Sequence, residues 1–170
     1  QNEQGEYDRV AIYKNKKAAE PFVVVPKGQM VSGIIDDVTK KDETKPACRS
    51  YKILELDPEG TIVRLWISNA LDIANDMLWH PASLHKDILE HVGHIPPVSL
   101  IGGEDDELVR EIFEPSWDVY DQWQADCFEY LMNNKDYQVV FSHLHNIDCA
   151  GHQLWHLGKT LEPWKHTDEK

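Results

Sequence analysis

The residues best suited to chemistry lie in one run, residues 141–156. Within it, Asp148 and His152 are four positions apart, so one turn of helix or a tight loop can aim both side chains at a single cation. Carboxylate oxygen and neutral imidazole nitrogen are ordinary ligands of zinc, and of manganese when more oxygen ligands are present. Gly151 lets the backbone turn closely beside an ion. This spacing makes Asp148 and His152 candidate ligands of a divalent metal.

Other polar side chains in this run have two interpretations each. His145 and Asn146 could orient a ligand, and His156, a further four positions on from His152, could face the same way. The ordinary roles are a hydrogen-bonded core histidine for His145 and a surface or packing histidine for His156. Cys149 lies beside the predicted ligands, where a small packing residue is the ordinary interpretation.

The spacing of Asp148 and His152 is weak evidence when taken alone, because an isolated Asp-x-x-x-His pattern is common by chance. A second, looser group of histidines also has only weak metal-like spacing. This looser group comprises His80, His85, His91 and His94.

The elements that must position Asp148 are predicted from periodicity. Val139, Val140 and Phe141 stand in a row within Tyr137–Leu144, which predicts a strand buried on both faces, as in a parallel sheet. Asp148 then falls just past the carboxyl end of that strand, where open α/β sheets place their sites. Two helices are predicted before it, Glu104–Phe113 and a second from Pro115 to about Met132. The second carries an apolar stripe at helical spacing: Trp117, Tyr120, Trp123, Cys127, Tyr130 and Leu131.

The first half of the chain has the pattern of antiparallel strands. Asp57-Pro58-Glu59-Gly60 separates two β-rich runs, and Pro followed by Gly predicts the turn of a hairpin. Its second strand, Thr61–Ile67, has one charged residue and is predicted to be largely buried. A helix is predicted over Leu84–Val92, with Ser83 as its N-cap and Gly93 ending it. The other predicted elements are strands at Arg9–Tyr13, Phe22–Val25, Met30–Ile35 and Tyr51–Leu56, and a loop at Thr39–Pro46.

These elements predict an α+β or α/β protein with two segments. Residues 1–95 form the β-rich part, and residues 96–170 hold the helices and one buried strand of an incomplete α/β sheet, with the boundary near Ile95–Gly103. One parallel strand needs partners, which we expect from the β-rich part or from sequence outside this chain. The sequence begins with Gln1, not Met, which leads us to expect a chain that has been processed or cut from a longer protein.

The whole pattern around Asp148 resembles the metal motif of the alkaline phosphatase superfamily. A strand, then Asn146-Ile147-Asp148, two small residues, Gly151-His152 and Trp155 are most similar to its type I phosphodiesterase/nucleotide pyrophosphatase branch. The resemblance covers Trp117–Trp155. It implies that Asp148 and His152 are ligands of one of two catalytic metals, usually zinc, in an enzyme that hydrolyses phosphoesters.

The chain also departs from that family. A Thr or Ser nucleophile after a metal-binding Asp, a later Asp-His-Gly element and a further His are expected, but none is found. Asp36–Asp37 is not followed by a nucleophile motif, and 18 residues follow His152. We therefore expect a fragment of the enzyme that is inactive alone, with residues 1–95 as an inserted or cap segment.

Composition limits the partners. The net charge of −13 argues against binding to a nucleic-acid backbone or an anionic membrane surface. No apolar run approaches the roughly 20 residues that span a bilayer. Three widely spaced cysteines predict free thiols and a cytoplasmic, reducing compartment. The alternative function is a self-contained binding domain without a catalytic role, and exposed apolar surface could drive self-association.

Overall fold

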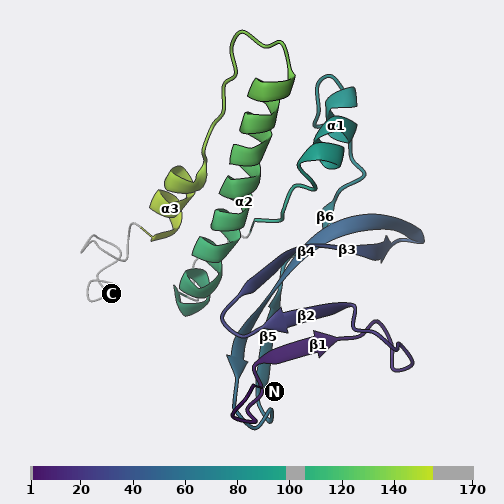
Figure 1. Ribbon diagram of the computed structural model, residues 1–170, viewed down its shortest axis with the longest axis vertical. Helices are drawn as coiled ribbons and strands as arrows, with labels where there is room; N and C mark the ends of the chain where they lie inside the picture. The colour runs from purple at the N-terminus through teal and green to yellow at the C-terminus, as the bar shows by residue number, and fades with distance from the viewer. Residues whose placement is uncertain (1, 99–105, 155–170) are drawn as a thin grey trace. The chain divides into compact units, whose positions relative to one another are not determined.

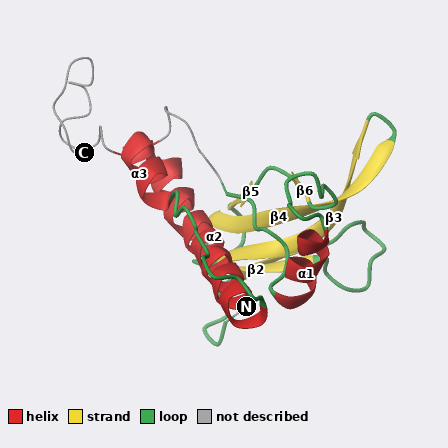
Figure 2. Ribbon diagram, turned by 90° about the horizontal axis from the view of Figure 1, so that it is seen from above, coloured by secondary structure: helices red, strands yellow, loops and turns green. Residues whose placement is uncertain are grey.

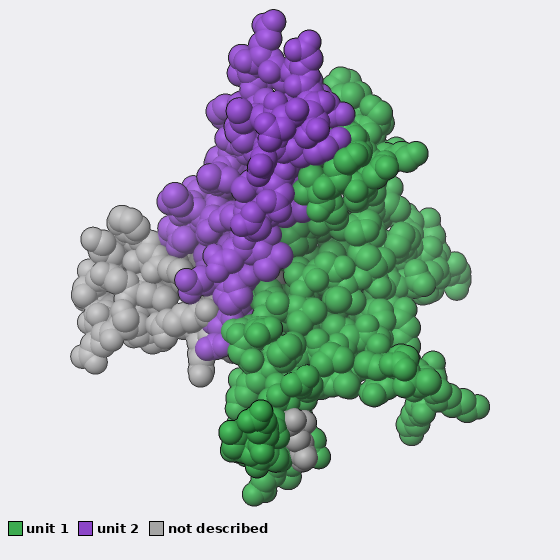
Figure 3. Space-filling model, in the orientation of Figure 1, with its two compact units in different colours: residues 1–98 green, residues 99–170 purple. Residues whose placement is uncertain are grey.

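The computed structural model describes residues 2–98 and 106–154, and its strands and helices separate along the chain (Figure 1). All described strands precede residue 73, and the longest helix follows residue 105. Figure 2 shows the strands in yellow and the helices in red. The chain divides into two compact units, Gln1–Val98 and Ser99–Lys170, coloured separately in Figure 3. The prediction of a mixed α and β protein with a strand-rich first half is confirmed.

The first unit contains two antiparallel sheets. A two-stranded sheet pairs β1 with β2, and a four-stranded sheet has the order β3-β4-β5, with β6 also paired to β4. The strands are β1 (Arg9–Ile12), β2 (Val23–Pro26), β3 (Met30–Lys40), β4 (Glu43–Leu56), β5 (Val63–Ile67) and β6 (Leu71–Asp72).

The core of this unit gathers residues from both sheets. Val23 and Val25 of β2 are buried together with Tyr51, Ile53 and Leu56 of β4. In β2 the buried valines alternate with the exposed Val24, as the two-residue period of a strand requires. Partly buried apolar residues of β1, β3 and β5 pack around this cluster.

The predicted loop at Thr39–Pro46 is wrong, because this stretch forms the tip of the β3–β4 hairpin. Lys41 and Asp42 alone make the turn, and both have positive φ, 50° and 66°. Two-residue hairpin loops favour this backbone because its twist matches that of the strands. The Thr39 and Thr44 hydroxyls face each other across the hairpin, 2.8 Å apart.

The hairpin predicted around Asp57–Gly60 is confirmed as β4–β5. The Asp57 carboxylate accepts hydrogen bonds from the Thr61 hydroxyl at 2.6 Å and the Ile62 amide at 2.7 Å. Gly60 has φ +71°, and a Cβ there would lie 2.8 Å from the Tyr7 ring. The predicted burial of Thr61–Ile67 is wrong. Among the described strands β5 pairs only with β4, and much of its apolar surface is exposed.

Helix α1 spans Ser83–His91, so the predicted helix is present. Its N-cap is Ala82 and no side chain caps it, so the assignment of Ser83 as the cap is wrong by one residue. Gly93, at φ +113°, follows the helix, and its amide bonds to the Ile88 carbonyl. The helix therefore ends where glycine can adopt a left-handed backbone.

Two predicted helices are a single one, α2 (Asp106–Asn134), with Pro115 inside it. Proline removes one backbone hydrogen bond and costs a helix interior about 3 kcal/mol. Aromatic packing along the same helix offsets part of this cost, since the Phe113 and Trp117 rings lie 5.9 Å apart across the proline. The part of the predicted first helix before Asp106 lies outside the described residues.

The predicted buried strand at Tyr137–Leu144 is wrong. The segment has no regular structure, and Val139 and Phe141 are 84% and 90% exposed. No described strand pairs with it, and a β-rich sequence becomes a strand only when a neighbour completes its hydrogen bonds.

Helix α3 (Asn146–Leu154) follows directly after this segment. No helix in residues 2–98 or 106–154 is long and apolar enough to span a membrane.

Candidate metal centre

Four potential metal ligands share one face at the start of α3. His145, Asp148, Cys149 and His152 occupy positions i, i+3, i+4 and i+7. His145 precedes the first helical residue, but its carbonyl accepts the Cys149 amide at 2.9 Å and so begins the helical pattern. The local fold therefore brings these four side chains to the same side of the chain.

Asp148 is the centre of this group. Its Oδ2 lies 2.9 Å from His145 Nε2, and its Oδ1 lies 3.5 Å from His152 Nε2. The two imidazoles thus approach the two oxygens of one carboxylate. Side chains of Asp148 and His152 are exposed, so the site is open to solvent on this side.

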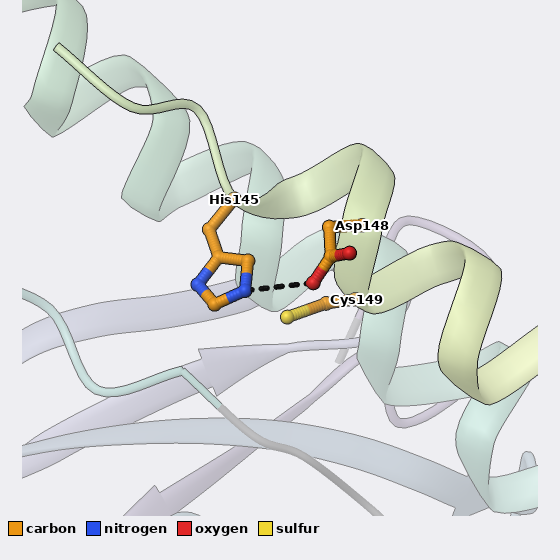
Figure 4. Close-up of side chains that lie close together, drawn as sticks. All are labelled: His145, Asp148 and Cys149. Atoms are coloured by element: carbon orange, nitrogen blue, oxygen red, sulfur yellow. Dashed lines mark hydrogen bonds and ion pairs between the residues drawn. The ribbon is translucent and has the colours of Figure 1, made fainter.

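Cys149 adds a sulfur atom to the same place. One ligand atom from each of His145, Asp148 and Cys149 lies within 4.8 Å of the others, and Figure 4 shows all three side chains directed to one region. Cys149 is 7% exposed. Burial, and secondarily the Asp148 charge, raise the pKa of its thiol above the ordinary value, because both disfavour a thiolate.

Helix α2 holds the chain that leads into this site. Asn146 Nδ2 donates to Asp121 Oδ2 at 2.6 Å, which fixes the first turn of α3. Gln124 Nε2 donates to the His143 carbonyl at 2.9 Å. The Trp117 ring meets the His145 ring edge-on at 6.4 Å. The anchoring residues of α2 are four and three positions apart, so they form a single stripe along that helix.

His145 is further restrained by its other neighbour. Its ring stacks on that of His143, with centroids 4.9 Å apart. An imidazole held between a tryptophan edge and a second imidazole keeps its Nε2 directed at Asp148, which reduces the entropy lost when a ligand binds. Side-chain packing thus restrains the orientation of the His145 ring relative to Asp148.

The predicted site residues have different outcomes. Asp148 and His152 lie together, and His145 joins them. Asn146 points to α2 and not to the cluster, while His156 lies outside the described residues. The looser group of histidines before residue 95 forms no set of three ligands in the described chain.

Sequence reasoning missed the place of Cys149 and the anchoring stripe on α2. The signal for Cys149 was its position four residues after His145, which is the same spacing that joins Asp148 to His152. The partner of Asn146, 25 residues earlier in the chain, had no such signal.

The chemistry of these donors fits a zinc ion. Imidazole nitrogen, carboxylate oxygen and thiolate sulfur are its three usual protein ligands. Manganese and magnesium prefer sites made of oxygen. Within the described residues no other set of three His, Cys, Asp or Glu ligands lies together.

No protein-family model, curated protein or solved structure matches this chain. The family assignment remains a prediction from Trp117–Trp155.

Proposed function

We propose that this chain contributes one part of a two-metal phosphoester-hydrolase site, with Asp148 and His152 as ligands of one ion. The observation that supports this most is the convergence of His145 and His152 on the two oxygens of Asp148. This arrangement offers a cation two imidazole nitrogens and one negatively charged carboxylate in close proximity. The resemblance of Asn146–Trp155 to the metal motif of phosphodiesterases and nucleotide pyrophosphatases supplies the reaction class.

The residues have distinct roles in this proposal. Asp148 supplies charge and His152 a neutral nitrogen, while His145 either orients Asp148 through their hydrogen bond or binds the ion itself. A bound divalent metal supplies positive charge that activates an oxygen nucleophile or stabilises a leaving oxygen during in-line displacement at phosphorus. The substrate class is a phosphodiester or a nucleotide pyrophosphate, and residues 1–95 act as the segment that shapes access to it.

The second ion and the nucleophile are not provided by the described donors. The full enzyme holds two ions, zinc or manganese, whereas the described residues assemble a single cluster of potential ligands, the one around Asp148. We propose that the remaining ligands belong to the parent enzyme outside this chain. The chain alone then binds metal but does not turn over substrate.

Calorimetric titration with zinc and with manganese tests the half-site. The wild-type chain should bind zinc with a dissociation constant of about micromolar or weaker, equivalent to about 8 kcal/mol or less. His152→Ala should weaken binding at least about tenfold, since one ligand is lost. His91→Ala is the matched control, because His91 is exposed and interacts with Asp87 of its own helix, α1. Equal loss in both variants, or no binding by the wild type, contradicts the proposal.

A second candidate function, an interaction domain, is favoured by one observation. Residues 137–144, here called the exposed apolar segment, contain no charged residue and expose Val139 and Phe141 almost fully. Antiparallel pairing of two copies about Val140 would place Val139 of each opposite Phe141 of the other, a favourable cross-strand pair. We propose that this segment supports self-association of the chain.

The location is also a proposal. Cys48, Cys127 and Cys149 are free thiols, which supports a reducing, cytoplasmic compartment. The acidic net charge supports the absence of nucleic-acid and anionic-membrane partners.

A further inference from the structure

We propose that Cys149 is a ligand of the same ion, so that His145, Asp148 and Cys149 form a sulfur-containing zinc site to which His152 adds an exposed fourth donor. This inference rests on the proposed metal function and specifies its ligand set. It assigns zinc, not manganese, to the site.

The geometry requires only small side-chain adjustments. Ligand atoms around a tetrahedral zinc ion lie about 3.3–3.8 Å apart, given metal–ligand bonds of about 2.0–2.3 Å. The three donors already lie within 4.8 Å of one another, and His145 Nε2 and Asp148 Oδ2 are 2.9 Å apart. Opening that pair slightly and drawing the sulfur inward by about an ångström reaches the required range, which rotations about side-chain bonds supply.

The position of the thiol places it within reach of the same ion. Cys149 is 7% exposed, and its sulfur and one ligand atom each of His145 and Asp148 lie within 4.8 Å of one another. A divalent ion held between them would attract the carboxylate and the thiolate together. On binding, the S–H bond breaks, the proton passes to solvent, and the sulfur lone pair forms the bond to the ion; no oxidation state changes.

The donor set has a direct consequence for metal choice. Thiolate sulfur prefers zinc and cobalt to manganese and magnesium, which favour oxygen. A site of one sulfur, one carboxylate and one or two imidazoles therefore discriminates strongly among these ions. The Asp148/His152 pair alone would bind zinc and manganese with less difference.

Titration of the reduced wild-type chain with Co²⁺ tests the proposal. Cobalt takes the place of zinc and reports its own ligands, because a thiolate gives a charge-transfer band in the near ultraviolet. We expect this band together with visible bands of tetrahedral cobalt, displacement by equimolar zinc and persistence in excess manganese. Cys149→Ser should remove the charge-transfer band and weaken binding at least about tenfold. Cys127→Ser, which removes a thiol of α2, should retain both.

The outcomes separate this inference from the half-site itself. Cobalt binding without a charge-transfer band, but abolished by His152→Ala, overturns the role of Cys149 and leaves the half-site standing. A band that persists in Cys149→Ser assigns another thiol and also overturns it. No cobalt or zinc binding by the wild type overturns both proposals. The wild-type spectrum reports sulfur ligation by itself, so the test does not depend on the folding of a variant.

Discussion

Substitution of Phe141 should abolish self-association of this chain. In Phe141→Ser the exposed apolar segment loses its largest side chain, which is 90% exposed and therefore adds little to the stability of the folded chain. Any effect on association is then separable from an effect on folding. Met77→Ser is the matched control, because Met77 is 89% exposed and lies in the first unit.

The expected magnitude follows from the area that pairing would cover. Burying Val139 and Phe141 in both copies gains about 1.5–3 kcal/mol for each side chain, or about 6–12 kcal/mol in all. Association itself costs about 4–15 kcal/mol, so the gain and the cost are similar in size and only a weak dimer is expected. A surplus of about 4–5.5 kcal/mol, toward the favourable end of these ranges, corresponds to a dissociation constant of about 0.1–1 mM. Removing both phenylalanines subtracts about 3–6 kcal/mol, which weakens association about 100-fold or more.

Sedimentation equilibrium from about 10 μM to about 1 mM covers this range. Each copy carries a net charge of −13, so added salt should strengthen the wild-type dimer by screening repulsion. Phe141→Ser should stay monomeric, whereas Met77→Ser should behave as the wild type. A monomeric wild type at all concentrations and salts, or a dimer that Phe141→Ser leaves intact, would refute the pairing.

Three further predictions concern the first unit and the activity of the chain. Gly60→Ala should lower the free energy of unfolding by about 2 kcal/mol in urea titrations, and Gly28→Ala should lower it by about 1 kcal/mol. Both glycines have positive φ, but of the two only position 60 would bring a Cβ against an aromatic ring, at 2.8 Å. Equal losses in the two variants would contradict the role of this contact. The hydrogen bond from the Thr61 hydroxyl is the largest cause, and bonds from backbone amides the next, of a pKa of Asp57 below its ordinary value of 3.8. The stability that the ionised carboxylate contributes is therefore complete above the unfolded-state pKa and is lost as pH falls through the lower native pKa. Asp57→Ala should therefore destabilise the fold at pH 7 but not at strongly acidic pH. Glu59→Ala replaces an exposed acid of the same turn and should have little effect on stability at either pH. A loss of stability in Asp57→Ala that does not depend on pH would exclude the charge as its cause. The purified chain should show no zinc-dependent phosphodiesterase turnover above a buffer control, and measurable turnover would contradict the division of the site.

Local sequence signals predicted much of the first unit. Pro58 and Gly60 between two β-rich runs fix the β4–β5 hairpin, because their backbone preferences act within four residues. The β3–β4 hairpin was hidden, since Lys41 and Asp42 adopt positive φ without the glycine or asparagine that usually marks such a turn. The charged residues of Thr39–Pro46 are typical of a solvated loop, although both strands of this hairpin continue to the turn.

Signals that depend on distant partners gave poorer predictions. Tyr137–Leu144 has the composition of a buried strand but forms none in the described structure, because composition cannot show whether a pairing neighbour exists. In the site, the four-residue spacing of Asp148 and His152 predicted their proximity. The burial of Cys149 depends on tertiary packing, so the sequence left its role open.

The most direct test of the central claim is a zinc titration of Asp148→Asn. This change keeps the size of the side chain and removes the charge that lies between the two imidazoles. Asp118→Asn, at an exposed position on α2, is the control for loss of one negative charge. We predict that Asp148→Asn weakens zinc binding about 100-fold or more, equivalent to about 2.8 kcal/mol, while Asp118→Asn binds as the wild type does. Unchanged zinc affinity in Asp148→Asn would contradict the assignment of a metal site to this helix.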